Sequence, residues 1–412
     1  MKLNIVLLLI MTFFWTLLVF YSVLTLAGVY FRAKKQQPIK LETYPSVSVL
    51  IPAHNEEIVI EDTLHAMAKL DYPGELNIYL LDDGSSDRTP EIGKSFQEAF
   101  SRIHYISVPP GEPKGKSRVL NYGLSIIESE YFLVYDADNQ PEPDAVKFLV
   151  EKAETTPKAA GAVGYVKTRN ADKNLLTQMI ALEFQVFQLL MQSGRWQLLK
   201  LGSLAGTNML LRKDIIDKLG KYDVYALAED AELTIRLTAE GYLLPVVPAS
   251  KTWEQEPETI KTFIKQRTRW LIGNLYLLEK LFLSSKFWRK KAFHHSIQHL
   301  TVYLLFAVLL LFSHLFFIGS LFDLFEPTYA APILMLWFMS YIVYTGQLIG
   351  AIVMDRTVSP LKVTVALIMY FTYAQLFVIL LGRSAVIYVW KRIVKRETIK
   401  WDKTNRFKNR PI

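Results

Sequence analysis

The sequence predicts an α/β fold, with a mixed, mostly parallel sheet covered by helices on both faces and joined to α-helical transmembrane segments. Short β-branched runs alternate with amphipathic runs between residues 40 and 285, which is typical of parallel strands joined by helices. Long apolar runs flank this stretch on both sides. Acidic residues stand at the ends of several expected strands, where sheets of this kind bind their ligands.

The composition fits a chain that is partly soluble and partly embedded in a membrane. Its 412 residues are 51% hydrophobic and 13% aromatic, and the net charge is +8. The absence of cysteine excludes disulfides, thiolate nucleophiles and cysteine metal sites. Lysine and arginine gather beside the apolar runs, at residues 32–35, 286–291 and 391–410. This distribution indicates contact with anionic membrane lipid and argues against a nucleic-acid partner.

The first apolar run predicts an N-terminal transmembrane helix over residues 1–31. A cleaved signal peptide is the rival interpretation, but the run is longer than the usual signal core. Basic residues follow at 32–35, so the positive-inside rule predicts that the next domain, residues 32–285, is cytoplasmic. Residues 286–412 then predict an interfacial helix, further transmembrane helices and a basic cytoplasmic tail.

The later apolar runs predict a multi-pass protein of the cell membrane. Residues 299–322 and 332–354 each have the length of one span, with residues 323–327 expected outside and 355–362 inside. Residues 361–390 are long for one span and short for two. A single crossing would leave the basic tail outside, against the charge rule. A break near residues 371–375 would return the tail to the cytoplasm, and we expect this arrangement.

The soluble stretch alternates between the two kinds of secondary structure. We expect strands at residues 47–51, 77–81, 131–135 and 161–166. We expect helices at residues 58–70, 90–100, 144–152, 175–191 and 259–281. This order places the residues that follow each strand at one edge of the sheet.

Polar residues follow the first two strands. Asn55 and Glu56 open the first helix, where they either attract a polar ligand or serve as a helix cap and first-turn acid. His54 is interpreted as structural. Asp83 follows the second strand and could accept hydrogen bonds from a base or a ribose, although a turn explains it equally well. Lys116, on a glycine-containing turn before a helix, could neutralise a phosphate, with a solvated lysine as the alternative.

Asp136 and Asp138 give the sharper signal because a buried strand leads directly into them. Residues two apart in an extended chain point to the same side. Both carboxylates can therefore face one hard cation, Mg²⁺ or Mn²⁺. Burying two like charges without a cation would be costly.

Two later clusters complete the set. Glu229 and Asp230 open a helix, either as acids that suit its dipole or as a site where one carboxylate is a general base. Arg269 can bind a diphosphate, and the indole of Trp270 can stack on a sugar. Their alternative is a helix at the membrane surface, and both interpretations can hold. The histidines between this helix and the next span are interpreted as interfacial and not as metal ligands: His294, His295 and His299.

In this order the clusters resemble glycosyltransferase family 2 enzymes with a GT-A fold, in particular the membrane-embedded cellulose, hyaluronan and poly-N-acetylglucosamine synthases. Residues 401–406 are also similar to bacterial members. By that resemblance Asp230, with Glu229, would be catalytic, and Asp138 and Asp136 would hold the metal. The acceptor would meet Gly206, Thr207, Asn208 and Trp270. The nucleotide-sugar would meet Pro52, Asn55, Glu56, Asp83, Lys116, Asp136, Gln266 and Arg269.

The resemblance implies an inverting transfer of a sugar from a UDP-sugar to a growing β-linked polysaccharide, dependent on Mg²⁺ or Mn²⁺ and coupled to export through the membrane. It leaves room for a small accessory membrane subunit. One alternative is an enzyme that adds one or a few sugars to a membrane lipid, so that the acceptor is a glycolipid. A second alternative is a catalytically silent membrane subunit that binds sugar.

Overall fold

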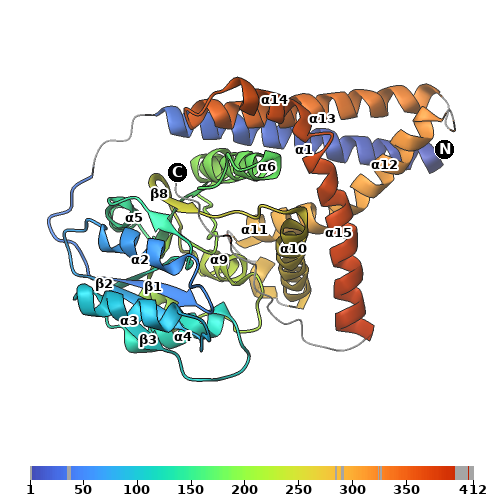
Figure 1. Cartoon of the computed structure of the whole chain (residues 1–412). Helices are drawn as coiled ribbons and strands as arrows, with labels where there is room; N and C mark the ends of the chain where they lie inside the picture. The colour runs from blue at the N-terminus through green and yellow to red at the C-terminus, as the bar shows by residue number, and fades with distance from the viewer. Residues whose placement is uncertain are drawn as a thin grey trace.

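The computed structural model describes residues 2–34, 39–283, 285–288, 292–322, 324, 327–394 and 407. An α/β domain occupies residues 47–283, and long apolar helices from both ends of the chain lie beside it (Figure 1). Most of the expected outside connection at residues 323–327 and most of the basic tail lie outside the described residues, as do residues 401–406.

A mixed sheet forms the centre of the α/β domain, with the strand order β3-β2-β1-β4-β7-β6-β8-β5 in the described residues. Neighbouring strands are parallel from β3 to β4 and between β6 and β8, whereas β7 is antiparallel to both of its neighbours. The short β5 pairs antiparallel with β8. The strands are β1 (Val47–Ala53), β2 (Leu76–Asp82), β3 (Ile103–Ser107), β4 (Tyr131–Val134), β5 (Gln140–Pro141), β6 (Gly161–Thr168), β7 (Met209–Arg212) and β8 (Val246–Glu254).

Helices cover both faces of this sheet, as the alternating pattern predicts. On β1, Val49 and Ile51 join one buried cluster, which contains residues of α2 (Ile60–Ala68), α3 (Thr89–Ala99) and α5 (Ala145–Glu154). Leu50 points to the opposite cluster, with α4 (Lys116–Ile126), α8 (Lys213–Lys218) and α9 (Glu229–Ala239). This alternation follows from the period of two in a strand. The sequence did not predict β3, β5, β7 or β8, and β8 contains Pro248, which is unusual in a strand interior.

A helical arm connects the sheet to the membrane part. It consists of α6 (Leu175–Phe184), the π-helical segment η1 (Gln185–Met191) and α7 (Gln192–Leu199), and it lies against α1 (Lys2–Ala33). The two helices approach so closely that a Cβ on Gly194 would lie 2.2 Å from the carbonyl oxygen of Leu24. A Cβ on Gly28 would lie 2.3 Å from that of Leu190. Glycine at both positions therefore permits the crossing, as in helix pairs within membranes.

Four helical stretches in the described residues are long and apolar enough to cross a membrane: Leu8–Ala33, Ala292–Gly319, Ala331–Met354 and Tyr373–Arg392. The second comprises α11 (Ala292–Leu300), η3 (Thr301–Phe306) and most of α12 (Ala307–Leu321). The third lies in α13 (Pro327–Met354). The fourth comprises α15 (Tyr373–Val389) and part of η4 (Trp390–Val394). The chain thus has several apolar stretches of spanning length, before and after the α/β domain.

The apolar stretch at residues 361–390 is broken, as expected. Helix α14 (Pro360–Met369) ends before residue 370, and α15 begins at Tyr373. Figure 1 shows α14 beside α13, whereas α15 turns away and runs along α10 (Ile260–Leu283). The path of the tail back to the cytoplasm stays a prediction.

A buried polar contact joins the α/β domain to the membrane helices. The Nζ atom of Lys167, on β6, lies 3.0 Å from a carboxylate oxygen of Asp355, directly after α13. The side-chain amide of Gln185 donates to the same carboxylate at 3.1 Å. Because both Lys167 and Gln185 bind Asp355, the end of α13 is fixed to β6 and to the helical arm.

Candidate active site

A cavity of about 830 Å³ lies between the carboxyl ends of the strands and the membrane helices. One end is lined by charged side chains from the loops after β1, β2 and β4 and from the start of α9. The other end is lined by a mixture of aromatic, apolar and polar side chains of α1, the helical arm and α11. The helix α10 lines the middle. A single cavity therefore extends from the sheet to the membrane part.

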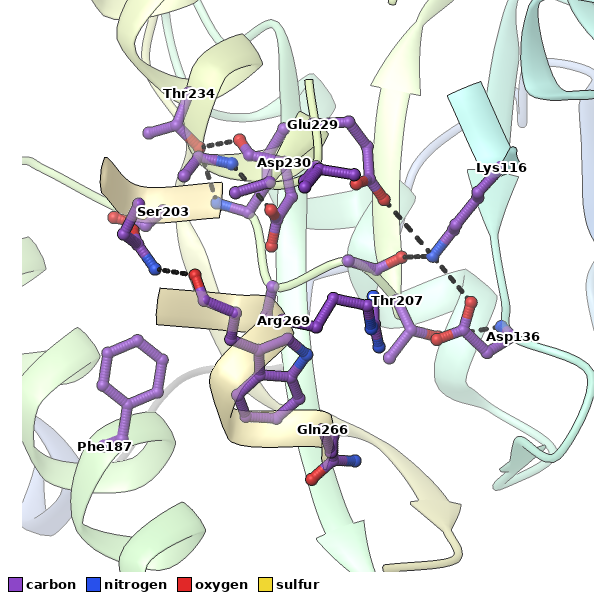
Figure 2. A pocket seen from close by; sticks show the side chains of 18 of the residues that line it. Lys116, Asp136, Phe187, Ser203, Thr207, Glu229, Asp230, Thr234, Gln266 and Arg269 are labelled. Atoms are coloured by element: carbon purple, nitrogen blue, oxygen red, sulfur yellow. Dashed lines mark hydrogen bonds and ion pairs between the residues drawn. The ribbon is translucent and has the colours of Figure 1, made fainter. Parts of the chain in front are cut away.

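Lys116 lies at the centre of the charged end (Figure 2). Its Nζ atom donates to Asp136 Oδ1 at 2.6 Å and to the carbonyl oxygen of Gly206 at 2.7 Å. Glu229 Oε1 lies 3.7 Å from the same nitrogen. Burial acts to lower the pKa of Lys116, but the charges of Asp136 and Glu229 outweigh it and raise the pKa. The ammonium group is therefore held charged, facing the cavity.

Asp136 and Asp138 follow β4, and both line the cavity. The buried Asp138 carboxylate accepts a hydrogen bond from the backbone N–H of Gln255 at 3.2 Å. Burial, followed by the charges of Glu256, Asp138 and Asp136, raises the pKa of nearby Glu254 well above its ordinary value. This crowding of acids suits a hard divalent cation, which would lower the cost of their charges.

The two aspartates fit such an ion when a bound ligand supplies the other atoms that coordinate it. Within the described parts of the chain, no group of three or more His, Asp or Glu side chains is arranged to hold a metal. Mg²⁺ commonly takes one or two carboxylates from the protein and its other ligands from water and substrate phosphates. Asp136 and Asp138 meet this requirement for a diphosphate-bound cation.

Asp230 lies in the cavity wall at the start of α9, next to Glu229 (Figure 2). The backbone N–H of Ala231 donates to its Oδ1 at 2.8 Å. Burial, followed by the charge of Glu229, raises the pKa of Asp230 to about 7. A carboxylate with this pKa can accept a proton near neutral pH and remain a stronger base than an ordinary aspartate.

Of the loop residues predicted to meet the acceptor, Gly206 and Thr207 line the cavity, whereas Asn208 lies in the protein interior. Gly206, with a φ of 80°, places its carbonyl oxygen on Lys116, and Thr207 lines the cavity. Asn208 is completely buried and does not line the cavity. It accepts from Tyr135 at 3.0 Å and donates to the Ser250 carbonyl oxygen at 3.0 Å. The prediction that Asn208 contacts the acceptor is therefore wrong in this geometry, because its amide connects buried strands.

Three predicted side chains of α10 line the middle of the cavity: Gln266, Arg269 and Trp270. Arg267, between them in sequence, is buried, and its guanidinium carbon lies 4.2 Å from the centre of the Trp270 ring. Arg267 also donates to Glu183 on α6 at 2.7 Å. The hydroxyl of Tyr373 donates to the same carboxylate oxygen at 2.5 Å. These contacts fix the orientation of the indole through Arg267 and Glu183, which also line the cavity.

Only some of the predicted residues in the loop after β1 line the cavity. Pro52 and Glu56 line the cavity, whereas the side chain of Asn55 accepts from the backbone N–H of Ser86 at 2.7 Å. Asn55 has a φ of 54° and lies five residues before α2, so it is neither a cavity residue nor the cap of that helix. It joins the loops that follow β1 and β2, which corrects both interpretations of this residue.

Asp83 lines the cavity and forms an ion pair with Arg118 on α4. Arg118 had not been predicted, because a single arginine on a helix carries no motif. Glu254 and Glu256 had also been missed. Two acids after an apolar strand are the signal that singled out residues 82–83, but β8 was not recognised as a strand. His295 and His299 were expected at the interface and instead line the membrane end of the cavity.

Comparisons with known proteins agree with this geometry. A family model described as "Glycosyltransferase like family 2" matches residues 45–273. The chain is 38% identical to a probable glycosyltransferase of Bacillus subtilis (strain 168), YdaM, over 95% of this chain and 96% of the relative. It is 26% identical to poly-beta-1,6-N-acetyl-D-glucosamine synthase of Staphylococcus aureus (strain COL), over 62% of this chain and 61% of the synthase.

A solved structure shows a similar fold. It is the mannosyltransferase PcManGT from Pyrobaculum calidifontis in complex with GDP-Man and Mn²⁺, with a TM-score of 0.53 and 18% identity. The similarity covers 94% of this chain and 99% of that protein. At this identity the likeness concerns the fold alone.

Proposed function

Because the chain belongs to glycosyltransferase family 2, we propose that it transfers a sugar from a UDP-sugar, with inversion, to a growing β-linked polysaccharide. One observation carries the proposal. Asp230, with a pKa raised to about 7, lines the same cavity as a fixed ammonium group and an indole. These are a base, a group for a diphosphate and a surface for a sugar ring.

The charged end of the cavity suits the donor. Lys116 and Arg269 can neutralise the diphosphate, and Gln266 can donate to it. Asp83 lies near the loop after β1, where Pro52 and Glu56 also reach the cavity, and we assign this region to the nucleoside. Arg118, its ion-pair partner, holds Asp83 in place.

Asp136 and Asp138 are the residues that would hold Mg²⁺ or Mn²⁺. A bound divalent cation would supply Lewis-acid stabilisation of the charge on the leaving diphosphate. The support from this chain is the buried Asp138 and the acidic surroundings that raise the pKa of Glu254.

Asp230 acts on the acceptor. Its carboxylate takes the proton of the acceptor hydroxyl, and the hydroxyl oxygen forms a bond to the anomeric carbon while the bond to the diphosphate breaks. The UDP leaves with the electron pair, and attack from the opposite face inverts the configuration. Trp270 presents the indole on which the acceptor ring stacks, at the boundary between the two ends of the cavity.

Chain elongation and export are supported by the position of the cavity. It extends from the donor end to α1, which contains one candidate span, and to α11, which begins another. We place the protein in the cell membrane with its catalytic domain in the cytoplasm, where UDP-sugars are made. The requirement for a small accessory subunit stays a prediction.

The test uses the full chain in lipid nanodiscs, with Mg²⁺ or Mn²⁺, and screens UDP-sugars and GDP-mannose for nucleotide release. We expect release from one UDP-sugar and a polymer ladder on a gel of labelled product. A product of one or two sugars on an extracted lipid would replace the polymer by the lipid acceptor. Absence of release from every donor, while UDP still binds, would indicate the silent subunit instead.

A further inference from the structure

The membrane end of the cavity contains a buried cation that the proposed sugar transfer does not use. Arg195, on α7, lines the cavity and is 5% exposed. Its guanidinium donates to Gln298 at 3.2 Å and to Gln192 at 3.1 Å. The Nε atom is buried and has no hydrogen-bond partner. Within the described residues Arg195 forms no ion pair, since both of its partners are neutral amides.

A buried guanidinium held only by neutral amides is unfavourable unless a ligand supplies a negative charge. Burial lowers the pKa of Arg195 to about 10, because only the phenols of Tyr21 and Tyr303 act in the opposite direction. A buried charge without a counter-charge is costly, and proteins usually pair such a group or use it. Lys116, Arg118 and Arg267, by contrast, each have a carboxylate partner.

The surroundings of Arg195 combine aromatic and polar side chains and include another unpartnered polar atom. The Nε2 atom of His295 is buried, has no hydrogen-bond partner and belongs to the same cavity lining. The ring of Phe187 lies 5.8 Å from the guanidinium carbon. Phe187 is 45% exposed and points into the cavity (Figure 2). An oxyanion beside Arg195 would therefore meet the guanidinium, and it would meet a second donor when the proton of His295 is on Nε2.

The site also lies beside helices of spanning length. Tyr21 and Leu24 of α1 line this end of the cavity, and Gly194, next to Arg195, packs against the Leu24 carbonyl. Helix α11, which contributes His295 and Gln298, begins the candidate span Ala292–Gly319. A molecule bound beside Arg195 would therefore lie next to two helices long and apolar enough to contact lipid.

We propose that Arg195 binds the phosphate of an acceptor lipid, with His295 as a second donor, and so holds the lipid headgroup at the membrane end of the cavity. The inference rests on the proposed function, because it names the class of acceptor for that same reaction. A sugar added to such a lipid could then be extended. A carboxylated polymer offers the same oxyanion chemistry, but the position of Arg195 between α1 and α11, which belong to two candidate spans, favours a lipid.

The experiment measures binding without donor, on the full chain in nanodiscs of zwitterionic lipid. The probes are dihexanoyl phosphatidic acid, dihexanoylglycerol, inorganic phosphate and a hyaluronan tetrasaccharide, each titrated by calorimetry. The variants are R195Q, R195K and the control K200Q, which removes a positive charge from an exposed residue at the end of the same helix. UDP is titrated into each variant to show that the donor end is folded.

We expect the native chain to bind phosphatidic acid at least about tenfold more tightly than dihexanoylglycerol. R195Q should weaken phosphatidic acid binding by about tenfold or more, while R195K and K200Q stay within about threefold and UDP binding is unchanged in all three. Equal binding of phosphatidic acid by R195Q and the native chain would overturn the proposal and leave Arg195 as a brace between α7 and α11.

Other outcomes identify the source of the anion. Inorganic phosphate binding as tightly as phosphatidic acid would overturn the lipid assignment. So would a tetrasaccharide that binds through Arg195 while phosphatidic acid does not, since the acceptor would then be a carboxylated polymer. Failure of the proposed sugar transfer is separate: it would show as absent nucleotide release even though phosphatidic acid binds through Arg195.

Discussion

The donor end and the membrane end of the cavity differ in how their positively charged side chains are partnered. At the donor end, Lys116 is in contact with Asp136 and Glu229, and Asp83 is paired with Arg118. At the membrane end, Arg195 is held by two glutamines and lines the cavity together with His295. The cations Lys116 and Arg118 at the donor end thus have carboxylate partners, whereas Arg195 has none among the described residues.

This difference indicates what each end is prepared to receive. A nucleotide-sugar brings its own cation, so the donor end needs acids for that cation as well as bases for the phosphates. An acceptor with a single anionic group brings no cation, and one guanidinium is sufficient for it. Trp270 lines the cavity between the two ends, where we expect the donor sugar and the acceptor to meet.

The largest effect should come from the base. Asp230→Asn keeps the shape of the side chain and removes its ability to accept a proton, so kcat should fall by about 10²- to 10⁴-fold. UDP binding, measured by calorimetry, should change by less than about twofold, because the donor contacts lie elsewhere. The matched control is Asp214→Asn, an exposed residue of α8. A loss of UDP binding in Asp230→Asn would move this residue to the donor end.

The second-largest effect should come from substituting a proposed metal ligand. Asp138→Ala should lower the affinity for UDP in the presence of Mn²⁺ by about 10- to 100-fold and leave metal-free binding nearly unchanged. The measurement is a titration of UDP with and without the metal. If the two curves of the variant matched those of the native chain, Asp138 would not belong to a metal site.

The dependence of activity on pH is a further test of Asp230 as the base. Protonated Asp230 cannot act as a base, so activity should be lost as pH falls through about 7 and should level off above it. Below the pKa, kcat/KM should drop by about tenfold per pH unit. Substrate binding is included in kcat/KM, so UDP affinity is measured across the same range. A flat profile between about pH 5 and 8 would contradict the assigned base.

The smallest effect is expected at the boundary between the ends. Trp270→Ala removes the stacking surface and should raise the KM for the acceptor by about two- to tenfold, while Trp270→Phe should retain part of the affinity. The KM for the donor should not change in Trp270→Phe. An increase of the donor KM alone would place the indole at the donor end.

The donor end could be predicted from the sequence because its residues follow strands. Asp83, Asp136 and Asp138 each stand directly after an apolar run, and the topology of a parallel sheet brings such ends together. Glu254 was missed for the converse reason, since Pro248 and the polar residues at 250–252 interrupt the apolar pattern of β8. Where the strand could not be recognised, neither could the acid at its end.

Local pattern also could not separate Gly206 and Thr207 from Asn208. The three are adjacent in sequence, but a φ of 48° turns the Asn208 side chain into the interior. The membrane end escaped prediction altogether. Arg195 is one cation in an otherwise apolar and polar helix, and its lack of a counter-charge depends on α1 and α11, which lie far away in the sequence.

The interruption between α14 and α15 has a consequence for how the protein is handled. Tyr373, the first residue after it, reaches Glu183, which in turn holds the guanidinium beneath the indole of Trp270. Detergent that loosens α15 would therefore be expected to disturb the acceptor platform first, so a solubilised preparation could still retain nucleotide while turning over poorly, and restoring lipid would recover transfer without changing nucleotide affinity.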